Sequence, residues 1–183
     1  MDAKFVEAVE TLGIWRTEMN KKPSDDQITI WERLVESHKA FASASHEFLA
    51  TDVDRVALVR SALRGKDRST AIYMLSCLPA SELQALFSDL VFLASFSHGS
   101  VQKIRDAILS LPKAWVLANI EAIAEPLLQA GTYDEYRRLL ELYAALDHGL
   151  ALQLARRAAD HGDEDIREAG EDFLVELETR PSP

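Results

Sequence analysis

The five histidines are the residues of this chain best suited to metal binding or acid–base catalysis, because imidazole does both near neutral pH. His38 and His46 stand eight residues apart in one amphipathic segment, too far from each other to share a metal without a third element. The other three form pairs at expected helix junctions: His98-Gly99, His148-Gly149 and His161-Gly162. Helix-end chemistry accounts for these pairs, and no metal site is predicted.

Other catalytic patterns are missing from the sequence. It contains no phosphate-binding glycine loop, no nucleophile elbow and no HExxH motif. The carboxylates are spread along expected helix surfaces, so none is placed as a desolvated general acid or base. Cys77, the single cysteine, is expected to be a small buried apolar residue. The sequence therefore predicts that the protein is not an enzyme and holds no cofactor.

The charge of the chain limits its partners. The 183 residues include 30 acids and 20 bases, a formal net charge of −10, and residues 147–183 contribute ten acids and four bases, a net −6. Phosphate backbones and anionic lipids repel such a chain, so neither nucleic acid nor a membrane is expected as a partner. One modest basic spot follows residue 52, and we interpret it as a solvated helix face rather than a phosphate site: Arg55, Arg60, Arg64, Lys66 and Arg68.

The N-terminal residues do not have the pattern of a secretory signal peptide. Acids stand where such a peptide has bases, and no long apolar run follows. A single cysteine also fits a reducing compartment. A cytoplasmic location is therefore expected.

Ser81–Ser97 is the most apolar stretch of the chain, and Asp89 is its only charge between Leu83 and Phe96. Wound as a helix, it is apolar on nearly every side, which requires neighbours on several sides. It is too short to span a bilayer. We expect this stretch to be the central helix of an all-helical domain that comprises residues 1–183.

Local signals predict about ten helices joined by short connections. Ser24-x-x-Gln27 and Thr132-x-x-Glu135 are capping boxes that begin helices. Proline disfavours helix in the residue before it, so Pro79 and Pro112 end helices. The fold class predicted from this pattern is all-α.

An internal repeat relates four of these helices. Near the start of each helix stands an apolar residue, and the four are separated by 32, 32 and 30 residues: Ile72, Ile104, Tyr136 and Ile166. The next position holds Tyr73, Arg105, Arg137 and Arg167. Single helix hairpins cannot cover their own apolar faces, so repeated hairpins are expected to stack.

At these residues the chain resembles a HEAT-repeat protein: Asp165-Ile166-Arg167-Glu168-Ala169, followed by Phe173 and Leu177, is similar to the second helix of such a repeat. The resemblance implies an α-solenoid, a HEAT/ARM-like superhelix of stacked antiparallel helix pairs. Second helices would then line its concave face, and an arginine ladder would join neighbouring repeats. The implied divisions are a capping helical hairpin at 1–50, four helix pairs and a disordered tail at 179–183; the pairs are 52–78, 81–111, 114–146 and 148–178.

The same assignment of first and second helices predicts a partner-binding ridge. The second and sixth residues after each repeat isoleucine or tyrosine should point outward, and they form a gradient from apolar to acidic: Met74, Leu78, Asp106, Ser110, Arg138, Leu142, Glu168 and Asp172. An apolar anchor beside charges suits protein binding. Alternatively, the N-terminal hairpin covers Met74 and Leu78.

Three functions remain open at this point. The leading hypothesis is a noncatalytic adaptor or scaffold that binds another protein. The acidic C-terminal region also fits an inhibitor of immunity type, which would neutralise a basic toxin or nuclease. The third is an enzyme on a HEAT-like scaffold; the charge disfavours a DNA glycosylase, whereas a tetrapyrrole lyase stays possible. Neither the partner nor the oligomeric state follows from the sequence.

Overall fold

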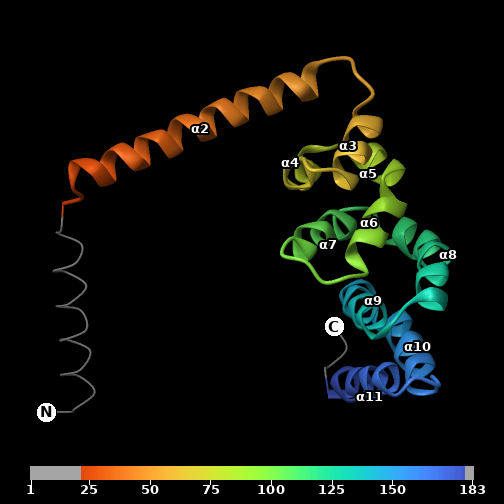
Figure 1. Cartoon of the computed structure of the whole chain (residues 1–183). Coiled ribbons are helices and arrows are strands. Elements are labelled where there is room, and N and C mark those ends of the chain that lie inside the picture. The colour runs from red at the N-terminus through yellow and green to blue at the C-terminus, as the bar shows by residue number, and fades with distance from the viewer. Residues whose placement is uncertain (1–21, 180–183) are drawn as a thin grey trace, which may run out of the picture. The chain divides into compact units, whose positions relative to one another are not determined.

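A computed structural model describes residues 22–179 of the chain, and helices account for all the regular structure in that range (Figure 1). The all-α class predicted from the sequence is therefore confirmed. The described range contains ten α-helices and one short 3-10 helix: α2 (Asp25–Ala50), α3 (Arg55–Arg64), α4 (Arg68–Met74), η1 (Leu75–Cys77), α5 (Ala80–Ala85), α6 (Phe87–Ala94), α7 (Val101–Leu109), α8 (Lys113–Ala130), α9 (Tyr133–Leu146), α10 (His148–Ala159) and α11 (Glu164–Thr179).

The chain divides into two units, Met1–Thr51 and Asp52–Pro183. The division coincides with the predicted border between the N-terminal hairpin and the repeats. The first arm of that hairpin falls in residues 1–21, outside the described range, as do residues 180–183 of the expected tail. Thr179, which was also assigned to the tail, is instead the last residue of α11.

Helix α2 begins at the predicted capping box. The Ser24 backbone N–H donates to Gln27 Oε1 at 2.9 Å, and the Gln27 N–H donates to Ser24 Oγ at 3.4 Å. The helix has no buried residue, and several large apolar side chains on it are exposed: Ile28, Ile30, Trp31, Leu34 and Phe41.

In the C-terminal unit several helices pack against the next one along the chain. Among these are α3 with α4, α6 with α7, α8 with α9, and α10 with α11, which lie in the residue ranges of the four expected helix pairs to within one residue, and α9 also contacts α10. The second members are also in contact in series, α4 with α7, α7 with α9, and α9 with α11. Figure 1 shows these second members following one another on one side of the unit, opposite α3, α8 and α10.

The core of this unit lies around α6 and α9, as the apolar character of Ser81–Ser97 indicated. Five residues of the two middle helix pairs have no accessible surface: Leu86, Leu90, Ile104, Ile120 and Leu139. A ring contact between Phe87 and Trp115, with centroids 5.0 Å apart, joins α6 to α8. The prediction that this stretch is central to the packing is confirmed.

The prediction of one continuous rod over Ser81–Ser97 is wrong. The helix breaks at Leu86, where φ is −93° and ψ is −1°, and α6 ends at Ala94. The Leu86 N–H is shared between the carbonyls of Glu82 and Leu83, a tightened turn. The break lets α5 pack against α3 while α6 contacts α7, α8 and α9.

The arginines of α3 are not a free solvated face. Arg60 Nε lies 3.0 Å from Asp89 Oδ2, and Arg64 Nη2 lies 2.6 Å from Asp89 Oδ1, while the Asp89 side chain is only 8% exposed. Arg55 forms a further ion pair with Glu82 at 2.6 Å. These bonds join α3 to α5 and α6, so the basic residues stabilise the packing of the first helix pair on the second.

Asp89→Asn should therefore lower the free energy of unfolding by about 1–3 kcal/mol, because two guanidinium groups lose a charged acceptor that is withdrawn from water. Urea denaturation monitored by circular dichroism measures this loss. The matched control is Asp67→Asn, since Asp67 is exposed and makes no capping hydrogen bond. Equal effects of the two substitutions would show that the Asp89 ion pairs contribute nothing to stability.

Candidate functional site

The structure places the predicted ridge residues in three different environments. Asp106, Ser110, Glu168 and Asp172 are exposed, and Arg138 is half-buried. Met74, Leu78 and Leu142 are buried, with relative exposures of 6%, 7% and 0%. The predicted apolar part of the ridge is therefore wrong, and its polar part lies at the surface.

Leu142 is buried because α9 has neighbours on several sides. This helix contacts α6, α7, α8, α10 and α11, so a position that faces away from one neighbour meets another. The offset of six residues from Tyr136 was derived for a helix with one free face. Leu142 belongs to the core and cannot anchor a partner.

Met74 is a buried residue of α4 itself, and Leu78 is buried for a different reason. Helix α4 ends at Met74, and η1 continues as a 3-10 helix of three residues per turn. Leu78 then has extended backbone, with φ −79° and ψ 144°. The α-helical offset therefore no longer applies to Leu78, and its side chain is buried.

An apolar groove of about 390 Å³ separates α4 and η1 from α7. Its apolar lining comes from both sides of the groove: Ile72, Leu75, Leu78, Leu83 and Ala107. Its polar groups come from Tyr73, Ser76, Lys103, Asp106 and Ser110. Lys103 Nζ lies 3.7 Å from the centre of the Tyr73 ring. Three predicted ridge residues, Leu78, Asp106 and Ser110, therefore meet at one groove.

An acidic groove of about 300 Å³ lies between α9 and α11. Three carboxylates and one guanidinium line it, together with an aromatic ring: Asp165, Glu168, Asp172, Arg137 and Tyr133. Arg137 Nη1 donates to the Tyr133 hydroxyl at 3.0 Å and lies 3.7 Å from Asp172 Oδ2. The lining therefore carries more negative than positive charge.

The two grooves use equivalent positions of the predicted repeat. On α7, the residues one before and two, three and six after Ile104 line the apolar groove: Lys103, Asp106, Ala107 and Ser110. On α11, the same offsets from Ile166 give the lining of the acidic groove: Asp165, Glu168, Ala169 and Asp172. Each groove is also lined by the residue that follows the repeat position on the neighbouring helix. This residue is Tyr73 of α4 in the apolar groove and Arg137 of α9 in the acidic groove.

Sequence reasoning considered offsets of two and six and missed the others. Lys103 and Asp165 stand one residue before the repeat isoleucine, and Tyr133 stands three before Tyr136. A side chain at these offsets contributes to a groove only when a second helix lies beside it. The repeat register marks the positions, but it does not show which of them face a neighbour.

An ion-pair network joins α7, which lines the apolar groove, to α9, which lines the acidic groove. Arg105 Nη2 lies 2.6 Å from Glu141 Oε2 and donates to the Arg138 carbonyl at 3.1 Å. Arg138 Nη1 binds Glu141 at 2.7 Å, and Arg138 Nε donates to Ser97 Oγ at 2.9 Å. The predicted ridge residue Arg138 thus serves the contact between two helices.

The Ser97 side of this network also holds Asp134. Burial disfavours the charged form of Asp134, but hydrogen bonds from the Ser97 N–H and hydroxyl and the nearby charge of Arg138 outweigh it, so its pKa lies below the ordinary value. Asp134 accepts those bonds at 3.0 and 2.8 Å. The loop before α7 is thereby attached to α9.

The residues singled out for chemistry are placed differently from the sequence expectation in two cases. Cys77 is exposed rather than buried, since it ends η1 at the surface. His148 begins α10 instead of ending α9, and Asp147 caps that helix. The rings of His98 and His161 accept backbone N–H bonds from Ser100 and Asp163, at 3.2 and 3.1 Å, within their turns.

Within residues 22–179, no group of three or more histidine, cysteine, aspartate or glutamate side chains is arranged to hold a metal ion. No helix in this range is both long enough and apolar enough to cross a membrane. A comparison with protein-family models, curated proteins and solved structures found no match to this chain.

Proposed function

We propose that Asp52–Pro183 is a noncatalytic protein-binding module, built as a short HEAT-like solenoid whose second helices provide the binding face. Two features support it. The helices pack in four consecutive pairs, with α4, α7, α9 and α11 in contact in series. The two grooves on this series also use the same offsets from the repeat isoleucines, as expected of stacked equivalent units.

The acidic groove between α9 and α11 is the main contact site in this proposal. Asp165, Glu168 and Asp172 present three carboxylates around about 300 Å³ of space. A lysine or arginine of a partner can pair with these carboxylates while its alkyl stem lies on the Tyr133 ring. Lining by three acids and one base is the single observation that favours a basic partner.

The surrounding charge helps such a partner to arrive. Residues 147–183 carry a net −6, and most of those acids lie on α11. A surface of one charge raises the association rate with an oppositely charged partner and makes it sensitive to ionic strength. The partner of this module is therefore another protein with an exposed basic segment.

The same groove favours a second candidate function, an inhibitor of immunity type that neutralises a basic toxin or nuclease. An adaptor and an inhibitor would both bind through the acidic face. They differ in their effect on the partner. An inhibitor at equimolar concentration blocks the activity of the partner, whereas an adaptor leaves that activity unchanged.

A lysine- and arginine-rich peptide labelled with a fluorophore tests the groove directly. Anisotropy titration should show binding to the full chain that weakens as salt is added. Glu168→Lys should weaken binding about tenfold, since it replaces an attraction in the groove by a repulsion.

The matched control is Glu171→Lys, which makes the same charge change on the same helix, at an exposed position that does not line the groove. Its effect should stay within about threefold, the size expected from the change in net charge alone. If the two variants weaken binding equally, binding of the peptide depends only on the net charge of the protein, and the groove is not the contact site.

A further inference from the structure

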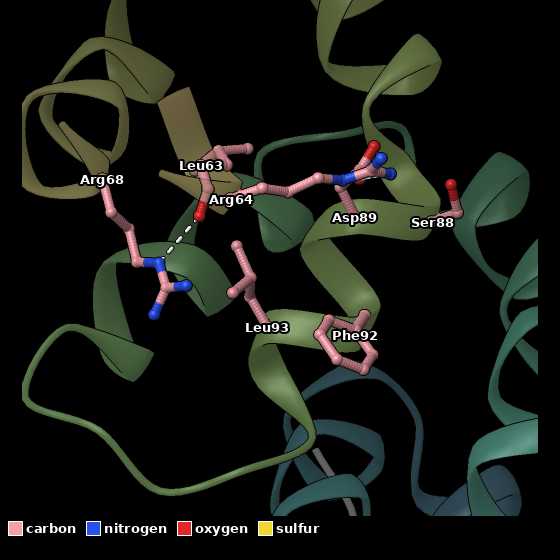
Figure 2. A pocket seen from close by; sticks show the side chains of 7 residues that line it. All are labelled: Leu63, Arg64, Arg68, Ser88, Asp89, Phe92 and Leu93. Carbon is pink, nitrogen blue, oxygen red and sulfur yellow. Dashed lines mark hydrogen bonds and ion pairs between the residues drawn. The ribbon is translucent and has the colours of Figure 1, made fainter. Parts of the chain in front are cut away.

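A second kind of pocket lies away from the acidic groove, on the first helix pairs of the C-terminal unit. It has a volume of about 520 Å³ and is bordered by α3, α4 and α6. Figure 2 shows Arg68 on one side of this pocket and Arg64 with Asp89 on the other, with Leu93 and Phe92 on the α6 side. We refer to it as the arginine pocket.

Part of the lining is apolar. Leu63 and Leu93 are buried, with exposures of 1% and 4%, and Phe92 is 53% exposed at the edge of the pocket. The Phe92 ring rests against Phe96, with centroids 5.4 Å apart in an edge-to-face arrangement. An aromatic ring that is held in place but half open to solvent offers contact area to an apolar ligand.

The charged lining is unbalanced. Arg64 and Asp89 pair with each other, and Asp89 also binds Arg60, so the single carboxylate of the pocket is already satisfied. Among the described residues, no carboxylate lies within ion-pair distance of Arg68. Two guanidinium groups and one carboxylate therefore line the arginine pocket, which leaves one net positive charge.

Arg68 is held in a defined position. Its side chain is half-buried, and its Nε donates to the Leu63 carbonyl oxygen at 2.7 Å, the bond drawn in Figure 2. This bond uses one donor and leaves the two terminal nitrogens for another acceptor. Because the guanidinium is already oriented, a ligand would not have to order it on binding.

We propose that the arginine pocket binds a monovalent carboxylate that is carried on an apolar body. The carboxylate would accept from the terminal nitrogens of Arg68, near Arg64, whose side chain is 70% accessible. The apolar body would lie on Phe92, Leu63 and Leu93. Planar carboxylates match the fork of donors that a guanidinium presents.

The charge and size of the pocket define this ligand class. One net positive charge among the lining side chains suits a monoanion better than a phosphate dianion. A volume of about 520 Å³ is in the range of small-molecule sites and is much larger than a bare carboxylate requires. A ring-sized apolar group attached to the carboxylate would occupy the remaining space.

This inference does not depend on the proposed function. The arginine pocket uses α3, α4 and α6 and carries positive charge, whereas the acidic groove uses α9 and α11 and carries negative charge. The basic spot that the sequence analysis interpreted as a solvated face supplies Arg64 and Arg68. Its residues have two roles here, since Arg60 and Arg64 hold Asp89 and Arg68 stays available for a ligand.

Hydrocinnamate is a suitable probe, because it is a monocarboxylate on a phenyl-ethyl body, and hydrocinnamamide is its uncharged counterpart. Titration of the isotope-labelled full chain, followed by amide NMR, should give saturable shifts around Phe92, Leu93 and Arg68 with the acid. Arg68→Gln should weaken this binding about tenfold through loss of a charge-assisted bond. Phe92→Ala should weaken it about threefold or more through lost ring contact.

The control variant is Arg156→Gln, which removes the same charge at an exposed position on α10 outside the pocket. It should bind hydrocinnamate as the unaltered chain does. Equal affinity of the Arg68→Gln variant or equal binding of the amide would overturn the proposal.

The natural source of the carboxylate can be a free small acid or the C-terminus of a polypeptide. A short peptide that ends in phenylalanine, compared with the same peptide amidated at its C-terminus, separates these sources. Either the peptide acid or the small acid should bind in preference to its amide and lose affinity with Arg68→Gln. If neither acid is preferred over its amide, the pocket does not recognise a carboxylate.

Discussion

Leu142→Asp is expected to lower the free energy of unfolding by at least about 4 kcal/mol, enough to leave much of the C-terminal unit unfolded. Leu142 has no accessible surface, and its helix α9 is in contact with five other helices. An aspartate there would lose the apolar contacts of leucine and bury a carboxylate without a partner. Urea denaturation followed by circular dichroism measures the loss.

Leu142→Met is the control that changes the shape of the buried side chain without introducing a charge. Methionine is close to leucine in volume, so this variant should lose less than about 1.5 kcal/mol. The sequence analysis, by contrast, predicted from the offset of six after Tyr136 that Leu142 lies at the surface. At the surface an aspartate would leave the stability nearly unchanged. A Leu142→Asp protein with an unaltered denaturation midpoint would restore that surface assignment and contradict the packing around α9.

Gly170→Ala is expected to destabilise the protein by about 2–4 kcal/mol, although alanine is the better helix former by roughly 1 kcal/mol. A Cβ at Gly170 would lie 2.7 Å from the Ala158 carbonyl carbon and 2.8 Å from the Ala155 carbonyl oxygen, and would also clash with the Ala159 nitrogen. These are backbone atoms of α10, so no side chain can move to make room. Helices α10 and α11 would have to separate.

Gly162→Ala is the matched control for this substitution. Gly162 lies in the connection before α11, and a Cβ there would have no neighbour within 4 Å. Its stability should change by less than about 0.5 kcal/mol. A thermal melt of both variants compares them, and a gain in stability from Gly170→Ala would show that α10 and α11 do not pack as closely as described.

Much of the helical fold was predictable because local signals decide where helices begin and end. The capping boxes at Ser24 and Thr132 are formed as the sequence indicated. The prolines at 79 and 112 precede new helices, α5 and α8. The apolar residues of Ser81–Ser97 identified the centre of the packing, because a helix without a polar side must be surrounded.

Parts of the candidate site were predictable for a related reason. Asp106, Glu168 and Asp172 were assigned to the surface from their offsets in the repeat, and they are exposed. They stand on α7 and α11, where these offsets face outward. Two of them line the acidic groove, although the groove itself needed Tyr133 and Arg137 from the neighbouring helix.

Tertiary structure alone decided which neighbours each face meets. The pattern of apolar residues along one helix tells which side is buried, but the number of helices that cover it depends on the whole arrangement. Leu142 is therefore buried in the crowded helix α9, whereas Asp172, at the equivalent register on α11, is exposed. The pattern of charges along one helix is limited in the same way. The sequence indicated a basic helix face for the arginines of α3, whereas in the fold Arg60 and Arg64 form ion pairs with Asp89. An ion pair between residues 25 to 29 positions apart has no local signal, because only the packing of α3 on α6 brings the guanidinium groups to the carboxylate.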